Sequence, residues 1–568
     1  MYRSVILLTL LASSFCIGMP QEIKSVNPTF DYDAARNHEI KPHRRTIPHE
    51  GVGEGFNQLH LTLTVSPAGN VLEAEAGGEE KDLKIWPDLR SEVLRWEFVP
   101  FEVNGKAVKA TVEEYLDLVP PERFPAVHKP APSIRPDSSI TITLQRSGCY
   151  GSCPSYQITI TTSGITFDGG GYVVAAGKHT DTVDPIAVRE LAKKFIAADF
   201  YSMNDEYQAG VTDCPTYVLS LSIDGHAKKV LDYVGSWVGM PQVISNLEEE
   251  VDAFARTERW VEGNGGLVPA LQAEGYNFNT FSAQVILKEA AFRGQTGTLR
   301  DLIAAGVPLE PIQAPKPKHE YEGIPFENRG WLGVASSHAD ALKVLIQVGA
   351  SKNDQNDKDL ALAGAADTGS LDAVRELIAY GANPNVDLAQ LVVTQESGGM
   401  IMQGSGSGSI LIKAAASGNP DVVREILSYH PKIEERDKDG KTAIFEAGDY
   451  RSSDIDGARV ECVKLLAEAG ADVNVRDNDG NTPLHETFLT DVEEELLKLG
   501  ANVNARNNNG ETPIFTTFDD DAIPLFIAHG ADLSIRNNKG QTVIEAAEEK
   551  GPQRQEALQK AMQNLPKH

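Results

Sequence analysis

Three segments near the C-terminal end of the chain repeat one pattern: ADVNVRDNDGNTPLHETF (471–488), ANVNARNNNGETPIFTTF (501–518) and ADLSIRNNKGQTVIEAAE (531–548). Their loop glycines, Gly480, Gly510 and Gly540, stand thirty residues apart, and Gly440 marks an earlier loop of the same kind. A fixed period of this length predicts an array of stacked structural repeats.

The residues of each segment predict a loop followed by two helices. Glycine permits the left-handed turn of the loop, threonine caps the first helix, and proline suits its first turn. The segment LLAEAGA (465–471) then predicts a second helix that ends at a glycine.

These features resemble ankyrin repeats, most clearly in Asp479-Gly480-Asn481-Thr482-Pro483-Leu484-His485. The resemblance implies an α-rich solenoid of about eight units over residues 263–568, with degenerate early copies and a mobile insertion at 386–409. It also implies a surface that binds other proteins. His485 is then expected to be a hydrogen-bonded structural residue.

Residues 55–120 predict a small α+β domain in the order strand, strand, helix, strand. LHLTLTV (59–65) alternates apolar and polar residues, and SPAGN (66–70) supplies a turn. IWPDLRSEVLRWEF (85–98) carries a helical stripe, and Asn104-Gly105 predicts a second turn before the strand ATVEEYLDLV (110–119). The segment resembles the C-terminal domain of TonB-type energy transducers, which implies an edge strand able to pair with a partner's strand.

A second α+β domain is predicted for residues 140–262, after a proline-rich linker at 121–139. It resembles a family of bacterial domains of unknown function. The matching residues are Cys149-Tyr-Gly-Ser-Cys153-Pro-x-Tyr156, Thr212-Asp213 and the late Lys-x-x-x-Asp232-Tyr233. The resemblance implies no activity.

The charge and the N-terminal residues bear on partners and location. A formal net charge of -29 repels nucleic acid and anionic lipid, so we expect neither as a partner. Residues 1–18 have the layout of a secretory signal, with Cys16 as a less favoured lipidation site, and residues 19–54 predict a flexible lead-in. No apolar run reaches the ~20 residues that span a bilayer. We therefore expect an exported protein, periplasmic or secreted.

The cysteines of the second domain leave three alternatives open. In an oxidising compartment Cys149 and Cys153 are expected to form a disulfide, with Cys214 as an alternative partner because Cys214-Pro-Thr-Tyr217 echoes Cys153-Pro-Ser-Tyr156. A thiol or redox role is the second alternative. The third is a metal site completed by His179 or His226. Cys462 is expected to be an inert buried residue.

Catalytic and cofactor motifs are missing from the sequence: it has no His-Glu-x-x-His, no phosphate loop and no nucleophile elbow. We therefore expect no catalytic residue and no cofactor. A weak calcium-loop pattern consists of Glu435, Asp437, Asp439 and Glu446.

Partner contacts are expected at the tips of the repeat loops, called fingers below. The expected contact residues occupy equivalent positions in successive units: Arg436, Lys438, Arg476, Asn478, Arg506, Asn508, Arg536 and Asn538. An arginine at each of these positions could instead bind acidic or amide neighbours within its own repeat. The sequence thus predicts a multi-domain scaffold, with two small α+β domains before an ankyrin-repeat solenoid, that binds a protein partner.

Overall fold

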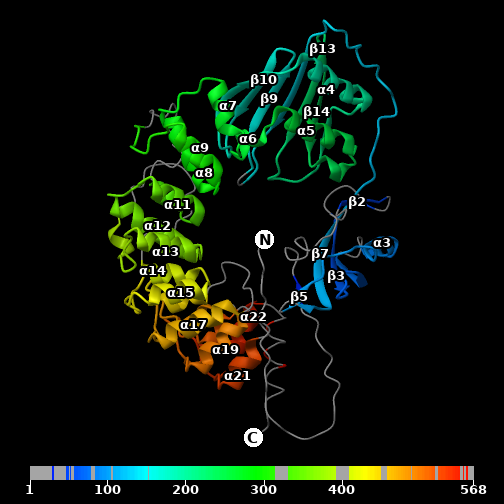
Figure 1. Ribbon diagram of the computed structural model, residues 1–568. Helices are drawn as coiled ribbons and strands as arrows, with labels where there is room; N and C mark the ends of the chain where they lie inside the picture. Colours follow the sequence, from blue (N-terminus) through cyan, green and yellow to red (C-terminus); the bar gives the residue numbers. More distant parts are fainter. Residues whose placement is uncertain are drawn as a thin grey trace. The chain divides into compact units, whose positions relative to one another are not determined.

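The computed structural model is a multi-domain protein with a sheet-rich N-terminal region and a helix-rich C-terminal region (Figure 1). It divides into two compact units, 1–262 and 263–568. The structure describes residues 29–30, 46–49, 52, 57–78, 83–103, 106–150, 153–313, 330–391, 408–448, 457–487, 489–517, 522–550, 554, 558 and 560. The predicted signal segment at 1–18 and the Asn104-Gly105 turn lie outside these residues.

The first sheet has the predicted order of strand, strand, helix and strand. Strand β3 (Asn57–Val65) pairs antiparallel with both β4 (Val71–Gly78) and β7 (Ala110–Val119). Leu59, Leu61 and Leu63 alternate with polar residues and are fully buried, and helix α3 (Trp86–Val93) contributes Leu89 and Val93 to the same core. Strands β5 (Glu102–Val103) and β6 (Lys106–Ala107) form a separate ribbon.

The flexible lead-in predicted for 19–54 is wrong in part, because it contributes two short strands to this sheet. Strands β1 (Thr29–Phe30) and β2 (Thr46–Pro48) pair in parallel with β7. Strands of two or three residues are too short to show an alternating pattern, so they could not be predicted from the sequence. The backbone groups of β7 at that edge supply their hydrogen-bond partners.

The second sheet has seven strands in the order β11-β10-β9-β8-β13-β14-β12. The strands are β8 (Ile140–Arg146), β9 (Tyr156–Thr161), β10 (Gly164–Gly169), β11 (Gly177–Asp181), β12 (Glu206–Gln208), β13 (Tyr217–Ile223) and β14 (His226–Tyr233). All neighbours are antiparallel except β12, which runs parallel to β14. The edge strand β11, with sequence GKHTD, lacks the apolar alternation that predicts a strand.

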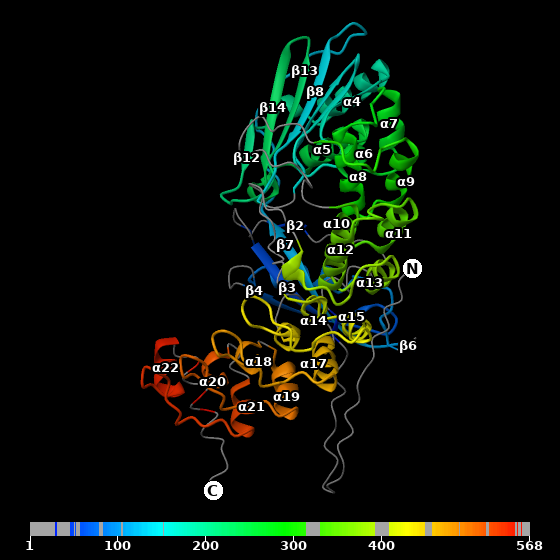
Figure 2. The ribbon, with the colours of Figure 1, turned by 90° about the vertical axis from the view of Figure 1, so that its left-hand side faces the viewer.

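Two amphipathic helices cover one face of this sheet. Helices α4 (Pro185–Ala197) and α5 (Gln242–Ala255) both contact β8 and β9 (Figure 2). The Asp184 side chain accepts a hydrogen bond from the backbone N–H of Ile186 and so caps the start of α4. Isoleucine, leucine and phenylalanine side chains fill the layer between helices and sheet. Two 3-10 turns, η1 (Phe200–Ser202) and η2 (Gly235–Val238), and helix α6 (Glu258–Val261) complete the domain.

The second unit is a succession of helix pairs (Figures 1 and 2). Its helices are α7 (Leu267–Ala273), α8 (Phe281–Phe292), α9 (Thr296–Ala304), α10 (Trp331–Val334), α11 (Ala339–Gln347), α12 (Gln355–Asp367), α13 (Leu371–Ala379), α14 (Ile410–Ala416), α15 (Pro420–Leu427), α16 (Ala443–Ala447), α17 (Ala458–Glu468), α18 (Pro483–Glu486), α19 (Thr490–Lys498), α20 (Pro513–Thr516), α21 (Ile523–Ala528) and α22 (Val543–Lys550).

The insertion predicted at 386–409 is described only at its two ends. Asp387 forms an isolated β-bridge with Ser409, and the Leu388 N–H donates to the Gly408 carbonyl at 3.1 Å. A 3-10 turn, η3 (Leu388–Gln390), follows the bridge. The ends are therefore joined by backbone pairing at the entrance to α14; residues 392–407 lie outside the described part.

Candidate functional site

Each finger of the solenoid is closed by one polar side chain. The Asp437 carboxylate accepts hydrogen bonds from the backbone N–H groups of Asp439 and Lys441, at 2.9 and 2.8 Å. Asp477, Asn507 and Asn537 make the same pair of bonds in the next units. Gly440 follows with φ of 80°, and a Cβ there would lie 2.5 Å from the Asn478 side-chain oxygen. This explains the glycine at the loop.

The arginines of the fingers link neighbouring units through the backbone. Arg436 Nη1 donates to the Gly440 carbonyl in its own loop, at 2.8 Å, and to the Arg476 carbonyl of the next loop, at 2.5 Å. Arg476 bonds in the same way to the carbonyls of Gly480 and Arg506. Arg506 donates to the Arg536 carbonyl at 2.8 Å. These bonds form a continuous series along the fingers, called the arginine ladder below.

An amide series runs beside the arginine ladder in the opposite direction. The Asn478 amide donates to the Lys438 carbonyl at 3.0 Å, Asn508 donates to the Asn478 carbonyl, and Asn538 donates to the Asn508 carbonyl. The two middle loops, with Arg476 and Arg506, are thereby bonded to both neighbouring loops, and each end loop is bonded to one.

The structure shows which groups the finger arginines bind. The head groups of Arg436, Arg476 and Arg506 bind backbone carbonyls, mostly of the next unit, and are not directed at acidic or amide neighbours within the repeat. The ladder ends at Arg536, which donates to the Gly540 carbonyl and to Glu545 at 2.7 Å. Sequence comparison within the repeats found these positions, but it could not show that the next unit supplies the acceptor.

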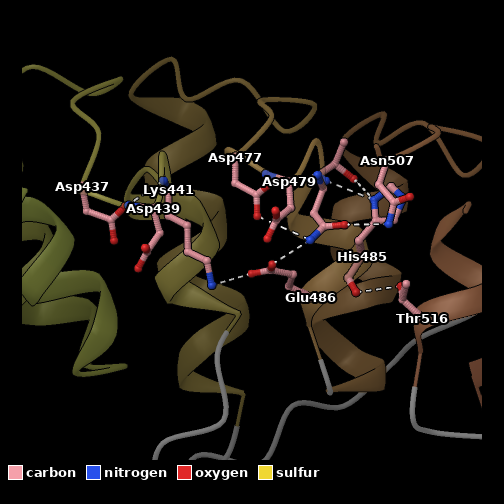
Figure 3. Close-up of polar contacts among 11 residues, drawn as sticks. Asp437, Asp439, Lys441, Asp477, Asp479, His485, Glu486, Asn507 and Thr516 are labelled. Carbon is pink, nitrogen blue, oxygen red and sulfur yellow. Dashed lines mark hydrogen bonds and ion pairs between the residues drawn. The ribbon is translucent and has the colours of Figure 1, made fainter. Parts of the chain in front are cut away.

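The contact positions expected from the sequence are exposed, and so are the residues one position further along each finger. The latter, called the tips below, are Asp439, Asp479, Asn509 and Lys539. Behind them a polar chain crosses three units: Lys441 pairs with Glu486 at 2.6 Å, Asn481 donates to Glu486 at 3.0 Å, and Asn507 donates to Asn481 at 2.9 Å (Figure 3). The fingers therefore present a row of exposed polar groups on a hydrogen-bonded base.

His485 is a buried structural residue, as the repeat pattern predicted. Its Nδ1 accepts a hydrogen bond from the Thr482 backbone N–H at 3.0 Å, and its Nε2 lies 3.1 Å from the Glu511 carbonyl. Nε2 therefore carries the proton that bonds this carbonyl. Burial lowers the pKa of His485 to about 4. The histidine thus stays neutral and joins its helix cap to the next finger.

The weak calcium pattern is not assembled into a cation site. Asp437 binds the backbone of its own turn. Glu446 is buried within α16. In the part of the chain that the structure describes, no group of three or more acidic, histidine or cysteine side chains could hold a metal ion, and this covers Glu435 and Asp439 as well.

A row of polar side chains crosses one end of the seven-stranded sheet. Arg146 pairs with Tyr156 on β9 and with Tyr217 on β13, and Tyr217 pairs with Asp232 on β14. Directly opposed residues of antiparallel strands face the same side. All four therefore extend the apolar face that α5 covers, and the Arg146 guanidinium lies 5.2 Å from the Tyr217 ring centre. We call these four residues the polar row.

Helix α5 adds two carboxyl groups to the polar row. Asp252 accepts a hydrogen bond from the Tyr156 hydroxyl at 2.9 Å. Glu248 is only 6% exposed, and burial together with the nearby charges of Asp232 and Asp252 raises its pKa to about 9. Glu248 is therefore protonated at neutral pH. The sequence did not reveal this cluster, although Arg146 ends an alternating strand and Tyr156 and Tyr217 each begin one.

The disulfide loop lies directly beside the polar row. Cys149 and Cys153 are joined by a disulfide with a Cα–Cα distance of 5.4 Å, Cys214 is a partly exposed free thiol, and Cys462 is fully buried. The two histidines considered as metal ligands lie elsewhere in the domain. His179 is buried, and its ring stacks on Trp260 with the ring centres 4.4 Å apart. His226 begins β14 and is paired with Ile223, which is at the opposite end of β13 from Cys214.

Comparison with family models identifies two parts of the chain. Residues 140–255 match a domain of unknown function, DUF6438. Residues 411–488 match a model of three ankyrin repeats, and residues 479–508 match the single ankyrin repeat. The chain is thus a multi-domain protein whose C-terminal region contains ankyrin repeats, which supports a role as a protein-interaction scaffold.

The curated relatives are similar only in part of their length. Mouse diacylglycerol kinase iota is 36% identical over 101 residues, which are 17% of this chain and 9% of the kinase. A Caenorhabditis elegans homologue of the transient receptor potential cation channel subfamily A member 1 is 28% identical over 179 residues. These are 31% of this chain and 13% of the channel protein. An ankyrin repeat-containing protein of Schizosaccharomyces pombe is 34% identical over 84 residues, which are 15% of this chain and 37% of that protein. The chain spans well under half of each relative.

One solved structure contains a chain that this protein covers almost fully. It is the predatory endopeptidase of Bdellovibrio bacteriovorus in complex with an immunity protein, with 27% identity, 35% of this chain covered, 96% of the other chain covered and a TM-score of 0.28. A TM-score this low provides no basis for a comparison of folds. In the described part of this chain, no helix is long and apolar enough to cross a membrane.

Proposed function

We propose that the protein is a scaffold that binds a protein partner along the fingers of its ankyrin solenoid. The observation that supports this most is the arginine ladder, which joins the loops of successive units through backbone carbonyls. A contact surface with its loops already fixed loses little conformational entropy when a partner binds.

The residues that contact the partner are proposed to be the exposed tips, not the arginines that the ladder uses. Asp439 and Asp479 give the earlier tips a negative charge, Asn509 is neutral, and Lys539 is positive. A partner with basic side chains facing the first two tips fits this order of charges. Exposed charges of this kind mainly affect association rate and specificity.

The test is charge reversal at the tips, followed by crosslinking in the native cell and mass spectrometry. We expect Asp439→Lys with Asp479→Lys to lower the yield of partner crosslinks, with a stronger effect at low ionic strength. The matched control reverses two exposed acids on the second helices, Glu468→Lys and Asp491→Lys. Equal loss in both variants, or crosslinks that come only from the N-terminal unit, would contradict the proposal.

We also infer that the protein is exported and works in the periplasm or outside the cell. The N-terminal signal pattern supports this, and so does the Cys149–Cys153 disulfide, because such bonds persist in oxidising compartments. Fractionation of cells that make the full chain tests the inference. Protein recovered only in the cytoplasm, with residues 1–18 retained, would contradict it.

The first sheet is proposed to share the strand-pairing mode of the TonB-type domain that it resembles. Strand β4 stands at the end of the strand order, next to β3 alone among the described strands. Its backbone groups on that side could pair with an extended partner segment. Slowed hydrogen exchange of residues 71–78 on partner binding is the expected sign, and unchanged exchange there would exclude this mode.

A further inference from the structure

We propose that Cys149, Cys153 and Cys214 form a thiol–disulfide exchange site, in which Cys214 displaces Cys153 from its bond to Cys149. The proposal goes beyond the scaffold role, because it gives the middle domain a chemistry of its own. It rests on the strand register, on hydrogen bonds past the strand ends and on the exposure of the three cysteines.

The register places Cys149 between the other two cysteines. On β8, Arg146 is opposite Tyr156 of β9 on one side and opposite Tyr217 of β13 on the other. Cys149 follows Arg146 by three residues, Cys153 precedes Tyr156 by three, and Cys214 precedes Tyr217 by three. If both pairings are extended past the strand ends, Cys149 is therefore opposite Cys153 on one side and opposite Cys214 on the other.

The observed disulfide agrees with the count on one side. Opposed residues of an antiparallel pair have Cα atoms about 4.5–5.5 Å apart, and Cys149 and Cys153 are 5.4 Å apart. A disulfide accepts a Cα separation of about 4.4–6.8 Å. Equivalent positions on β8 and β13 meet the same requirement if the pairing continues beyond the strands.

Hydrogen bonds carry the β8–β13 pairing one residue past the strands. The Ser147 N–H donates to the Thr216 carbonyl at 2.9 Å, and the Thr216 N–H donates to the Ser147 hydroxyl at 3.0 Å. Cys149 and Cys214 each stand two residues beyond this pair. Only short stretches of chain therefore have to move to bring the two sulfur atoms together.

The environment of Cys214 suits a group that moves. Asp213, just before it, has a left-handed φ of 68°, and Pro215, just after it, has no N–H to bond to the sheet. The Cys214 N–H makes a long bond, 3.4 Å, to the Tyr233 hydroxyl. All three cysteines are partly exposed, whereas Cys462 in the solenoid is fully buried. Access of this kind favours exchange.

The exchange step is balanced without an oxidant. Cys214 gives its proton to solvent, and the thiolate attacks Cys149 Sγ. The Cys149–Cys214 bond forms as the Cys149–Cys153 bond breaks, and Cys153 leaves as a thiolate that takes a proton from solvent. The domain keeps one disulfide and one thiol throughout. Exchange therefore moves the thiol from Cys214 to the loop at Cys153.

The first experiment uses the full chain with Cys153→Ser. The protein is held in glutathione redox buffer at about pH 8, where thiolates are abundant, then quenched with acid, alkylated and mapped by peptide mass spectrometry. A close intramolecular pair outcompetes glutathione, so we expect a Cys149–Cys214 linked peptide and a roughly tenfold or greater loss of alkylation at both residues. Alkylation or glutathionylation of both cysteines, while the amides of β8 and β13 stay protected from hydrogen exchange, would overturn the proposal.

The second experiment needs no change to the cysteine pair and covers the case in which that variant does not fold. The unsubstituted chain is exposed to a slow alkylating reagent at the same pH. Exchange predicts label on both Cys214 and Cys153, and Cys214→Ser is expected to abolish the label at Cys153. Label on Cys214 alone, with the Cys149–Cys153 bond intact in every molecule, would also overturn the proposal. Unlabelled Cys462 shows that the solenoid remains folded.

Discussion

Two buried residues, one in each unit, have pKa values shifted in opposite directions. His485 is held neutral by burial in the solenoid, and Glu248 is held protonated by burial in the middle domain. Both groups avoid a buried charge, but they do so on opposite sides of neutrality. Acid is therefore expected to destabilise the solenoid around His485, and alkali is expected to destabilise the middle domain around Glu248.

We predict that His485 makes the solenoid less stable in acid. Its folded pKa of about 4 lies below the ordinary 6.5, so its contribution is complete above about pH 6.5 and is lost as the pH falls toward 4. The loss amounts to about 3 kcal/mol. Hydrogen exchange of peptides from 457–517 should show that the stability gap between the native chain and His485→Gln narrows as the pH falls. A constant gap from neutral pH to pH 4 would show that the histidine does not titrate as proposed.

We predict that Glu248→Gln stabilises the middle domain at neutral pH. The folded pKa of about 9 lies above the ordinary 4.5, so the contribution of Glu248 to stability is complete below pH 4.5 and declines as the pH rises through 9. At pH 7 the difference is at most about 3 kcal/mol. The gain should vanish near pH 4 in thermal unfolding, and the exposed neighbour Glu249→Gln should give little change at either pH.

At the scale of elements, the fingers are joined to one another by bonds between repeats, in addition to the bonds that close each loop. Arg436, Arg476 and Arg506 each donate to a carbonyl of the following loop, and the asparagine amides donate back to the preceding loop. Nearest-neighbour bonds of this kind are what make a repeat array cooperative.

We predict that Arg476→Met destabilises the solenoid by about 1–2 kcal/mol, because two carbonyls lose a charged donor. The matched control is Arg375→Met, which removes the ion pair with Glu425 between α13 and α15 and should cost less than Arg476→Met, because solvent screens a pair with an exposed partner. Chemical unfolding of the solenoid in the full chain measures both. Equal effects would mean that the ladder adds nothing beyond an ordinary surface pair.

The sequence predicted elements well where a side-chain pattern repeats over many residues. The glycine and threonine positions of the repeats predicted loops and first helices, and the alternation in 59–65 predicted a strand. Short elements such as β1, β2 and β11 were missed, because they are held by the neighbouring strand and have no pattern of their own. The polar row was missed for a similar reason: strand pairing, not spacing along the chain, brings Arg146, Tyr156, Tyr217 and Asp232 together.

At the scale of the whole molecule, the two units differ in architecture, and we propose different tasks for them. The unit up to residue 262 contains two small sheets, a disulfide and the polar row, and the unit from 263 contains the solenoid. The ankyrin match covers residues 411–508, and paired helices also precede it, from α8 and α9 onward. Partner binding is proposed for the second unit and thiol chemistry for the first.

The arginine ladder also has two ends, and these ends have a mechanical consequence. The series begins at Arg436 and stops at Arg536, which bonds to Glu545 within its own repeat. The two middle fingers are each bonded to two neighbouring fingers, whereas each end finger is bonded to one. Under a pulling force along the array, the two end fingers should therefore detach before the middle ones.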